Sequence, residues 1–166
     1  MSLYDITIPQ MIRVLGQVPG WLDKATAYAE KKKFDPDVLL SARLAPDQWS
    51  LAQQILAITI GPQRLGAFVR GVEPPKVDAA DTTIAGVRAR LDAAISILRS
   101  FKPEEFKGME DRMIPLPFMP GKGMKAMDFV IQFAMPNFYF HVVTTYAILR
   151  HNGVDVGKLD FIGSID

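Results

Sequence analysis

Two histidines are the main candidates for catalysis or metal binding in this sequence. His141 and His151 are ten residues apart on one predicted helix. They are therefore about 15 Å apart along its axis and cannot share a metal within one chain. The helical neighbours of His141 are Asn137, Thr144 and Thr145, which are weak ligands for zinc-like ions. We predict an isolated imidazole on an apolar face, which is either a hydrogen-bonded core or pocket residue or a catalytic or ligand-binding one.

Other familiar catalytic patterns are missing or incomplete. The chain has no cysteine, which excludes disulfides, thiolate metal sites and cysteine nucleophiles. Gly61 and Gly66 have the spacing of a phosphate-binding loop but lack its Lys-Ser/Thr pair. The neighbouring carboxylates Glu104 and Glu105 could take part in acid–base chemistry, but they are more typical of a charged surface turn. The motifs alone therefore do not assign a reaction.

Methionines and aromatic residues are concentrated in residues 113–140. Such side chains can line an adaptable apolar pocket, or they can simply belong to the core. The set comprises Met113, Met119, Met124, Met127, Met135, Phe118, Phe129, Phe133, Phe138, Tyr139 and Phe140. Both interpretations are open at this point.

Composition indicates one globular domain over residues 1–166. Apolar residues make up 49% and charged residues 22%, and the formal net charge is +1. These values argue against disorder and give no electrostatic reason to expect nucleic acid as a partner. Residues 129–149 lack charge but contain several polar side chains, which favours a buried helix over a membrane span. With no secretory pattern at residues 1–11, we expect a cytoplasmic protein without a membrane partner.

The apolar residues recur with helical spacing along most of the chain. We expect long helices over residues 8–33 (kinked at Pro19-Gly20), 46–70 (kinked at Pro62), 83–101 (capped by Thr82 or Thr83) and 128–151, and a short helix over 36–43. Residues 112–127 have the turn pattern of a β-hairpin, and residues 154–166 are expected to be extended. The predicted fold is all-α: a four-helix bundle with a short β-hairpin before the last helix and an extended C-terminal tail.

Three segments, taken together, resemble a known family. They are ARLAPDQWSL from residue 42, GVEPP from residue 71, and PNFYFHVVTTYAILRHNGV from residue 136, which is followed by GKLDFIG from residue 157. In this order they are similar to the bacterial family of domain of unknown function 1993 (DUF1993). That family belongs to the DinB/YfiT-like superfamily of four-helix bundles, and the resemblance covers nearly the whole chain.

The resemblance also bears on metal binding. Many members of the superfamily bind a divalent metal through three histidines, and some resemble transferases that use bacillithiol, mycothiol or glutathione. The Trp49-Ser50 start of the second helix matches the superfamily pattern. The three ligand positions are occupied here by Ala57, Asn137 and His141. The resemblance thus implies the fold, together with a degenerate site that binds no metal or other cofactor.

We therefore expect a small-molecule binding or accessory protein. Its ligand pocket is predicted around His141, Asn137, Gln54, Trp49 and Tyr146. One alternative is a thiol-dependent transferase or hydrolase with His141 as the catalytic base, or with metal bound across a dimer through His151. A further alternative is a structural homodimer without a ligand. The superfamily resemblance favours a homodimer in each case.

Overall fold

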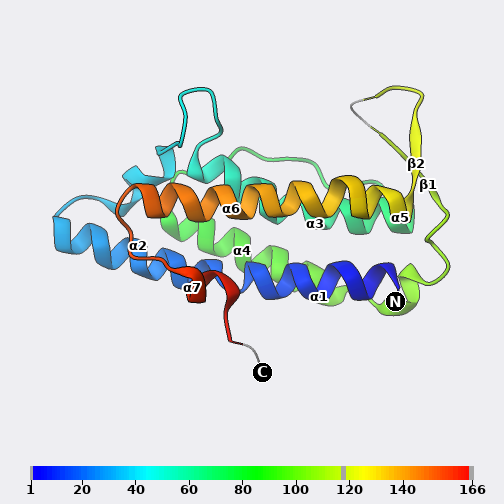
Figure 1. The fold of residues 1–166 in the computed structure, drawn as a ribbon, viewed down its shortest axis with the longest axis horizontal. Coiled ribbons are helices and arrows are strands. Elements are labelled where there is room, and N and C mark those ends of the chain that lie inside the picture. The colour runs from blue at the N-terminus through cyan, green and yellow to red at the C-terminus, as the bar shows by residue number, and fades with distance from the viewer. Residues whose placement is uncertain (1, 117–118, 165–166) are drawn as a thin grey trace.

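The computed structural model describes residues 2–116 and 119–164, so Phe118 of the aromatic set lies outside the described residues. Its long helices run along a common axis and form the predicted all-α four-helix bundle (Figure 1). Three sides of the bundle are formed by α3 (Leu51–Arg70), α4 (Ile84–Ser100) and α6 (Met135–His151). The fourth side is formed by α1 (Leu3–Leu15) and α2 (Val18–Lys32), which lie end to end.

The expected kink at Pro19-Gly20 is instead a break between two helices. The break falls at Gly16 and Gln17, upstream of the proline, and Pro19 lies in the first turn of α2. A proline is well placed there because a first-turn N–H has no partner within the helix. At the other end, α1 begins with a capping box in which the side chains of Ser2 and Asp5 satisfy each other's backbone N–H groups.

The predicted second long helix starts later than expected. Residues 36–41 form a 3-10 helix, η1 (Pro36–Ser41), and residues 42–50 form a loop. The helix α3 then begins after Ser50, whose backbone N–H donates to Gln53 Oε1 at 2.9 Å. It continues through Pro62 and ends at Gly71, whose φ of 70° suits glycine. This late start leaves Trp49 on the loop, beside the first turn of α3.

The predicted hairpin is present between α4 and α6. Thr83 caps α4 by accepting a hydrogen bond from the Gly86 N–H at 3.1 Å, as expected. A short 3-10 helix, η2 (Pro103–Phe106), precedes the strands β1 (Met113–Pro115) and β2 (Gly123–Lys125). The strands pair antiparallel, with Met113 opposite Lys125. The hairpin therefore forms the long crossover of the bundle.

The last long helix is less regular than its sequence pattern predicts. It consists of α5 (Ala126–Phe129), a π-helical segment η3 (Val130–Ala134) and α6. Pro136 has no N–H and cannot make the usual bond to the carbonyl of Gln132. Instead, the Met135 N–H bonds to the Val130 carbonyl, which closes a π turn. The irregularity thus has a local cause in the sequence.

The tail is not extended throughout, contrary to the prediction. Residues 158–162 form a short helix, α7 (Lys158–Ile162). The indole N–H of Trp21 donates to the Asp160 carbonyl at 2.9 Å, and the ring of Phe161 stacks on Trp21. These contacts hold α7 against α2, which is why the apolar residues of the tail fold into a helical turn rather than an extended strand.

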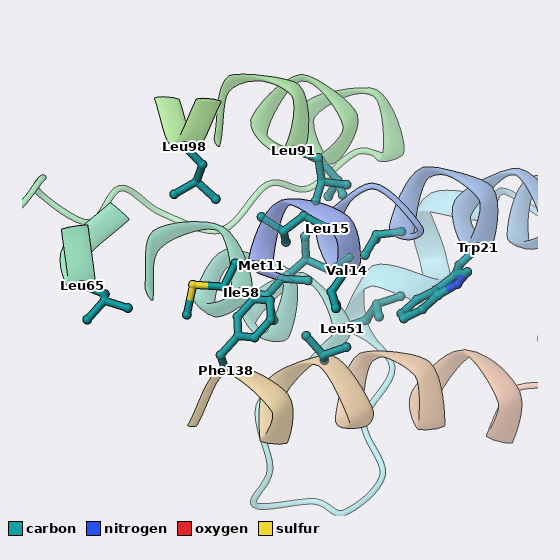
Figure 2. Close-up of a cluster of buried hydrophobic side chains, with 14 of the residues drawn as sticks. Met11, Val14, Leu15, Trp21, Leu51, Ile58, Leu65, Leu91, Leu98 and Phe138 are labelled. Atoms are coloured by element: carbon teal, nitrogen blue, oxygen red, sulfur yellow. The ribbon is translucent and has the colours of Figure 1, made fainter. Parts of the chain in front are cut away.

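The hydrophobic core lies along the centre of the bundle (Figure 2). Met11, Leu15, Ile58, Leu91 and Phe138 meet there from four different helices, and each is at most 3% exposed. Burying side chains of this size contributes about 1.5–3 kcal/mol each to folding. Within the described residues, we find no helix long and apolar enough to cross a bilayer.

Candidate functional site

A cavity of about 650 Å³ lies between α3 and the last helical stretch. The α3 wall includes Leu56, Ile60 and Phe68, and the opposite wall includes Phe129 and Phe133. Aromatic residues of the 113–140 set therefore do line a cavity. Its methionines do not, and Met113 and Met119 are exposed instead. The result is a largely apolar chamber with aromatic walls.

His141 lies at this cavity and is held by a neighbouring amide. Its Nδ1 is 2.7 Å from Oε1 of Gln54, a side chain on the facing helix that is only 2% exposed. The orientation of the amide is set by its other end, because Gln54 Nε2 donates to the Trp49 carbonyl at 3.2 Å. Gln54 therefore presents a carbonyl oxygen to the imidazole, which requires the proton of neutral His141 to sit on Nδ1.

This arrangement leaves the second ring nitrogen of His141 as an acceptor. Burial lowers the pKa of His141 below its usual 6.5, so the imidazole is neutral near pH 7. Its Nε2 makes no hydrogen bond to any residue that the structure describes, and it is not sealed off from solvent. The atom can therefore accept a hydrogen bond from a bound molecule or take a proton from it.

Trp49 covers His141 from the loop before α3. The two rings stack with their centroids 5.4 Å apart and their planes at 10°. Trp49 also lines the cavity, although it is 52% exposed. It thus forms part of the boundary between the cavity and solvent.

Comparison with known proteins places this architecture in a family. The family model "Domain of unknown function (DUF1993)" matches residues 3–162. The chain belongs to the DUF1993 family. It is also similar to the crystal structure of a DinB family member protein from Shewanella denitrificans, with 39% sequence identity and a TM-score of 0.93. That match covers 98% of this chain and 93% of the other. The curated proteins include no match.

In this DUF1993 protein, the three positions that the family resemblance implied as metal-ligand positions all border the same cavity. Ala57 comes from α3, and Asn137 and His141 come from α6, one turn apart. Their donor set does not fit a zinc-like ion, because alanine offers no ligand atom and an amide is a weak ligand. Among the described residues, no three His, Cys, Asp or Glu side chains lie close enough together to hold a metal ion.

Gln54 does not line the cavity itself and contacts His141 from behind it. Two other residues named in the sequence analysis lie away from the cavity. Tyr146, which the sequence grouped with the pocket, donates its hydroxyl to the Val156 carbonyl at 3.2 Å and packs against Trp21. Val156 and Phe161, which Tyr146 also contacts, are in the tail, so Tyr146 helps to hold the tail on the bundle. His151 lies in the last turn of α6 and is exposed.

One residue at the cavity of this DUF1993 chain is not apparent from the sequence patterns. Arg64 lines the cavity and is exposed, which places it at the mouth. It follows Ala57 by two helical turns, so both residues share one face of α3. Its position seven residues beyond Ala57 is the signal that could have identified it.

Proposed function

We propose that this DUF1993 protein is a cytoplasmic binding protein for a small, mostly apolar molecule, which it holds in the cavity between α3 and α6 without a metal ion. The observation that carries the proposal is the cavity of about 650 Å³ with apolar walls and a few polar groups. Ligand pockets are typically in the range of about 300–1,000 Å³ and have this mixed lining.

The close packing of protein interiors supports a function for this cavity. Interiors are close-packed, and voids larger than a water molecule are few. An open chamber of this size forgoes contacts that larger side chains at positions such as Ala57 and Gly61 would supply. The polar groups of His141 and Asn137 at its wall give a bound molecule fixed points for orientation.

A neutral fluorescent probe tests the proposal. N-phenyl-1-naphthylamine is expected to bind the wild-type protein saturably, with increased emission. Ala57→Phe places a ring in the cavity and should weaken binding by about tenfold or more, while the helical circular dichroism is retained. Ala93→Phe, at an exposed position on α4, is the matched control. No saturable binding, or equal binding by all three proteins, would overturn the proposal.

An enzymatic role is the second candidate, favoured by the His141–Gln54 pair. A neutral imidazole with one nitrogen oriented by an amide and the other open to a cavity has the geometry of a general base. For a thiol-dependent transferase, the test is turnover of glutathione with an activated aryl chloride. Turnover that His141→Phe abolishes would support the enzyme; the same slow rate in both proteins would reject it.

Homodimer formation stays a prediction from the family resemblance. Light scattering of the wild-type protein across micromolar concentrations tests it directly, and the dimer is expected to persist throughout. A monomer mass over this range would reject it.

A further inference from the structure

We infer that the ligand is an aromatic organic acid, whose acid group pairs with Arg64 and whose opposite end carries a hydrogen-bond donor for His141 Nε2. The inference rests on the proposed binding function and names the chemical class of the ligand. It follows from the two ends of the cavity and from the walls between them.

The charge of the cavity favours an anion. Arg64 is the one charged side chain among the described residues that line it, and no Asp or Glu is among them. The guanidinium of Arg64 also makes no ion pair or hydrogen bond with any described residue. An arginine at the mouth of an apolar chamber, without a carboxylate to neutralise it, provides a fork of donors that matches a carboxylate.

The other end of the cavity requires a donor. His141 Nε2 is an acceptor because Nδ1 carries the proton toward Gln54 Oε1. A ligand hydroxyl can donate to Nε2, whereas a carboxylate there would face a lone pair. The two ends therefore select different groups, and this fixes the direction in which the ligand binds.

The middle part of the ligand is defined by the distance between its two polar contacts and by the residues that line the cavity. Gln54, the partner of His141, is ten residues before Arg64 on α3, which corresponds to about 15 Å of helical rise. The long arginine side chain shortens the gap that a ligand must span. Phe68, Phe129, Phe133 and Phe138 line the space, and aromatic rings pack favourably against such walls.

Three related probes separate the two polar contacts. p-Hydroxycinnamate carries an acid and a hydroxyl at opposite ends of an aromatic body. Cinnamate lacks the hydroxyl, and p-hydroxycinnamamide replaces the carboxylate with a neutral amide. By isothermal titration calorimetry, we expect p-hydroxycinnamate to bind about tenfold more tightly than the amide, and about threefold to tenfold more tightly than cinnamate.

Variants assign each preference to a residue. Arg64→Gln should abolish the preference for the acid over the amide, and Arg64→Lys should restore part of it. Arg99→Gln, which changes an exposed arginine on a different helix, α4, should leave the preference for the acid over the amide unchanged. His141→Phe should abolish the preference for the hydroxyl. Because this buried variant is at risk of misfolding, the comparison of cinnamate with p-hydroxycinnamate on the wild-type protein tests the same contact independently.

The outcomes distinguish this inference from the binding function itself. If N-phenyl-1-naphthylamine enters the cavity but p-hydroxycinnamate binds no more tightly than its amide, the proposed binding function stands. The inference that the ligand carries an acid group is then wrong. An acid preference that survives Arg64→Gln also overturns the inference. Failure of all probes, including N-phenyl-1-naphthylamine, overturns the binding function as well.

Discussion

The two faces of α3 meet very different surroundings. On one face, Leu51, Ile55 and Ile58 are fully buried in the core. On the other, Ala57 and Arg64 border the open cavity. A single helix thus combines a close-packed surface with one left unfilled. The comparison indicates that the residues of α3 that border the cavity contribute less to core packing, which leaves them free to serve a ligand.

The sharpest test of this contrast is a pair of identical truncations. Ile58→Ala should reduce the free energy of unfolding by about 2–5 kcal/mol, because it opens a void in the packed core. Ile60→Ala, on the cavity wall, should cost about 1 kcal/mol or less, since the side chain already borders open space. Urea denaturation of both variants measures the difference. Equal losses would contradict the division of α3 into two faces.

The cavity should also accept an engineered metal site. Because positions 57, 137 and 141 border one space, the double variant Ala57→His/Asn137→His is expected to supply three imidazoles with an open fourth position. Nickel or zinc at a hundred times its dissociation constant should then raise the free energy of unfolding by about 2.7 kcal/mol. Thermal denaturation during metal titration measures the effect.

The single variants are the controls for that experiment. Ala57→His and Asn137→His each present two imidazoles and should bind metal much more weakly. The parent protein, with one imidazole at the cavity, should show no metal-dependent stabilisation. A folded double variant without metal-dependent stabilisation would contradict the expectation that the three positions lie close enough to share a metal ion.

A smaller loss of stability is expected when the His141–Gln54 hydrogen bond between α6 and α3 is broken. His141→Ala should reduce the free energy of unfolding by about 1–3 kcal/mol, because it leaves the buried Gln54 Oε1 without its hydrogen bond. His141→Ala combined with Gln54→Leu should recover part of the loss, since the stranded acceptor is then removed. A fully stable His141→Ala protein would place the histidine outside the packed structure.

The smallest effect is a pH dependence from the same residue. The folded pKa of His141 is lowered by burial from 6.5, so below about pH 6.5 the unfolded state binds a proton more readily than the folded state. This contribution to stability should be fully present above this pH and should be lost as the pH falls through the lowered folded pKa of His141. His141→Phe should lack this decline, and His151→Gln, at the exposed histidine, should retain it. A wild-type curve without the decline would contradict the prediction.

Helical spacing was sufficient to predict the bundle but not its interruptions. The apolar periodicity identified the four long helical stretches, and Thr83 marked the start of α4. The helix break was expected at Pro19-Gly20 but falls at Gly16 and Gln17, just upstream. The turn at α7 was missed because it depends on contacts with distant parts of the chain. Trp21, for example, holds the tail through Asp160, a residue far along the sequence.

The site was predictable where its residues share a helix face. Asn137 and His141 are four residues apart, and the family pattern supplied Trp49 and Ala57 from the start of the facing helix. Tyr146 belongs to the same helix, but it lies more than a turn beyond His141 and faces the tail. Arg64 was missed because an exposed arginine on a helix looks ordinary until the cavity beside it is known.

The π-helical segment has a consequence for how the hairpin end of the molecule is oriented. A π turn contains about one residue more than an α turn, and one residue corresponds to about 100° of rotation around a helix. The segment Val130–Ala134 therefore determines how α5 is rotated about the helix axis relative to α6. It sets which way Phe129 and everything before it face relative to His141. Deleting one residue there would rotate the aromatic wall around the helix axis while leaving every core residue of α6 in register.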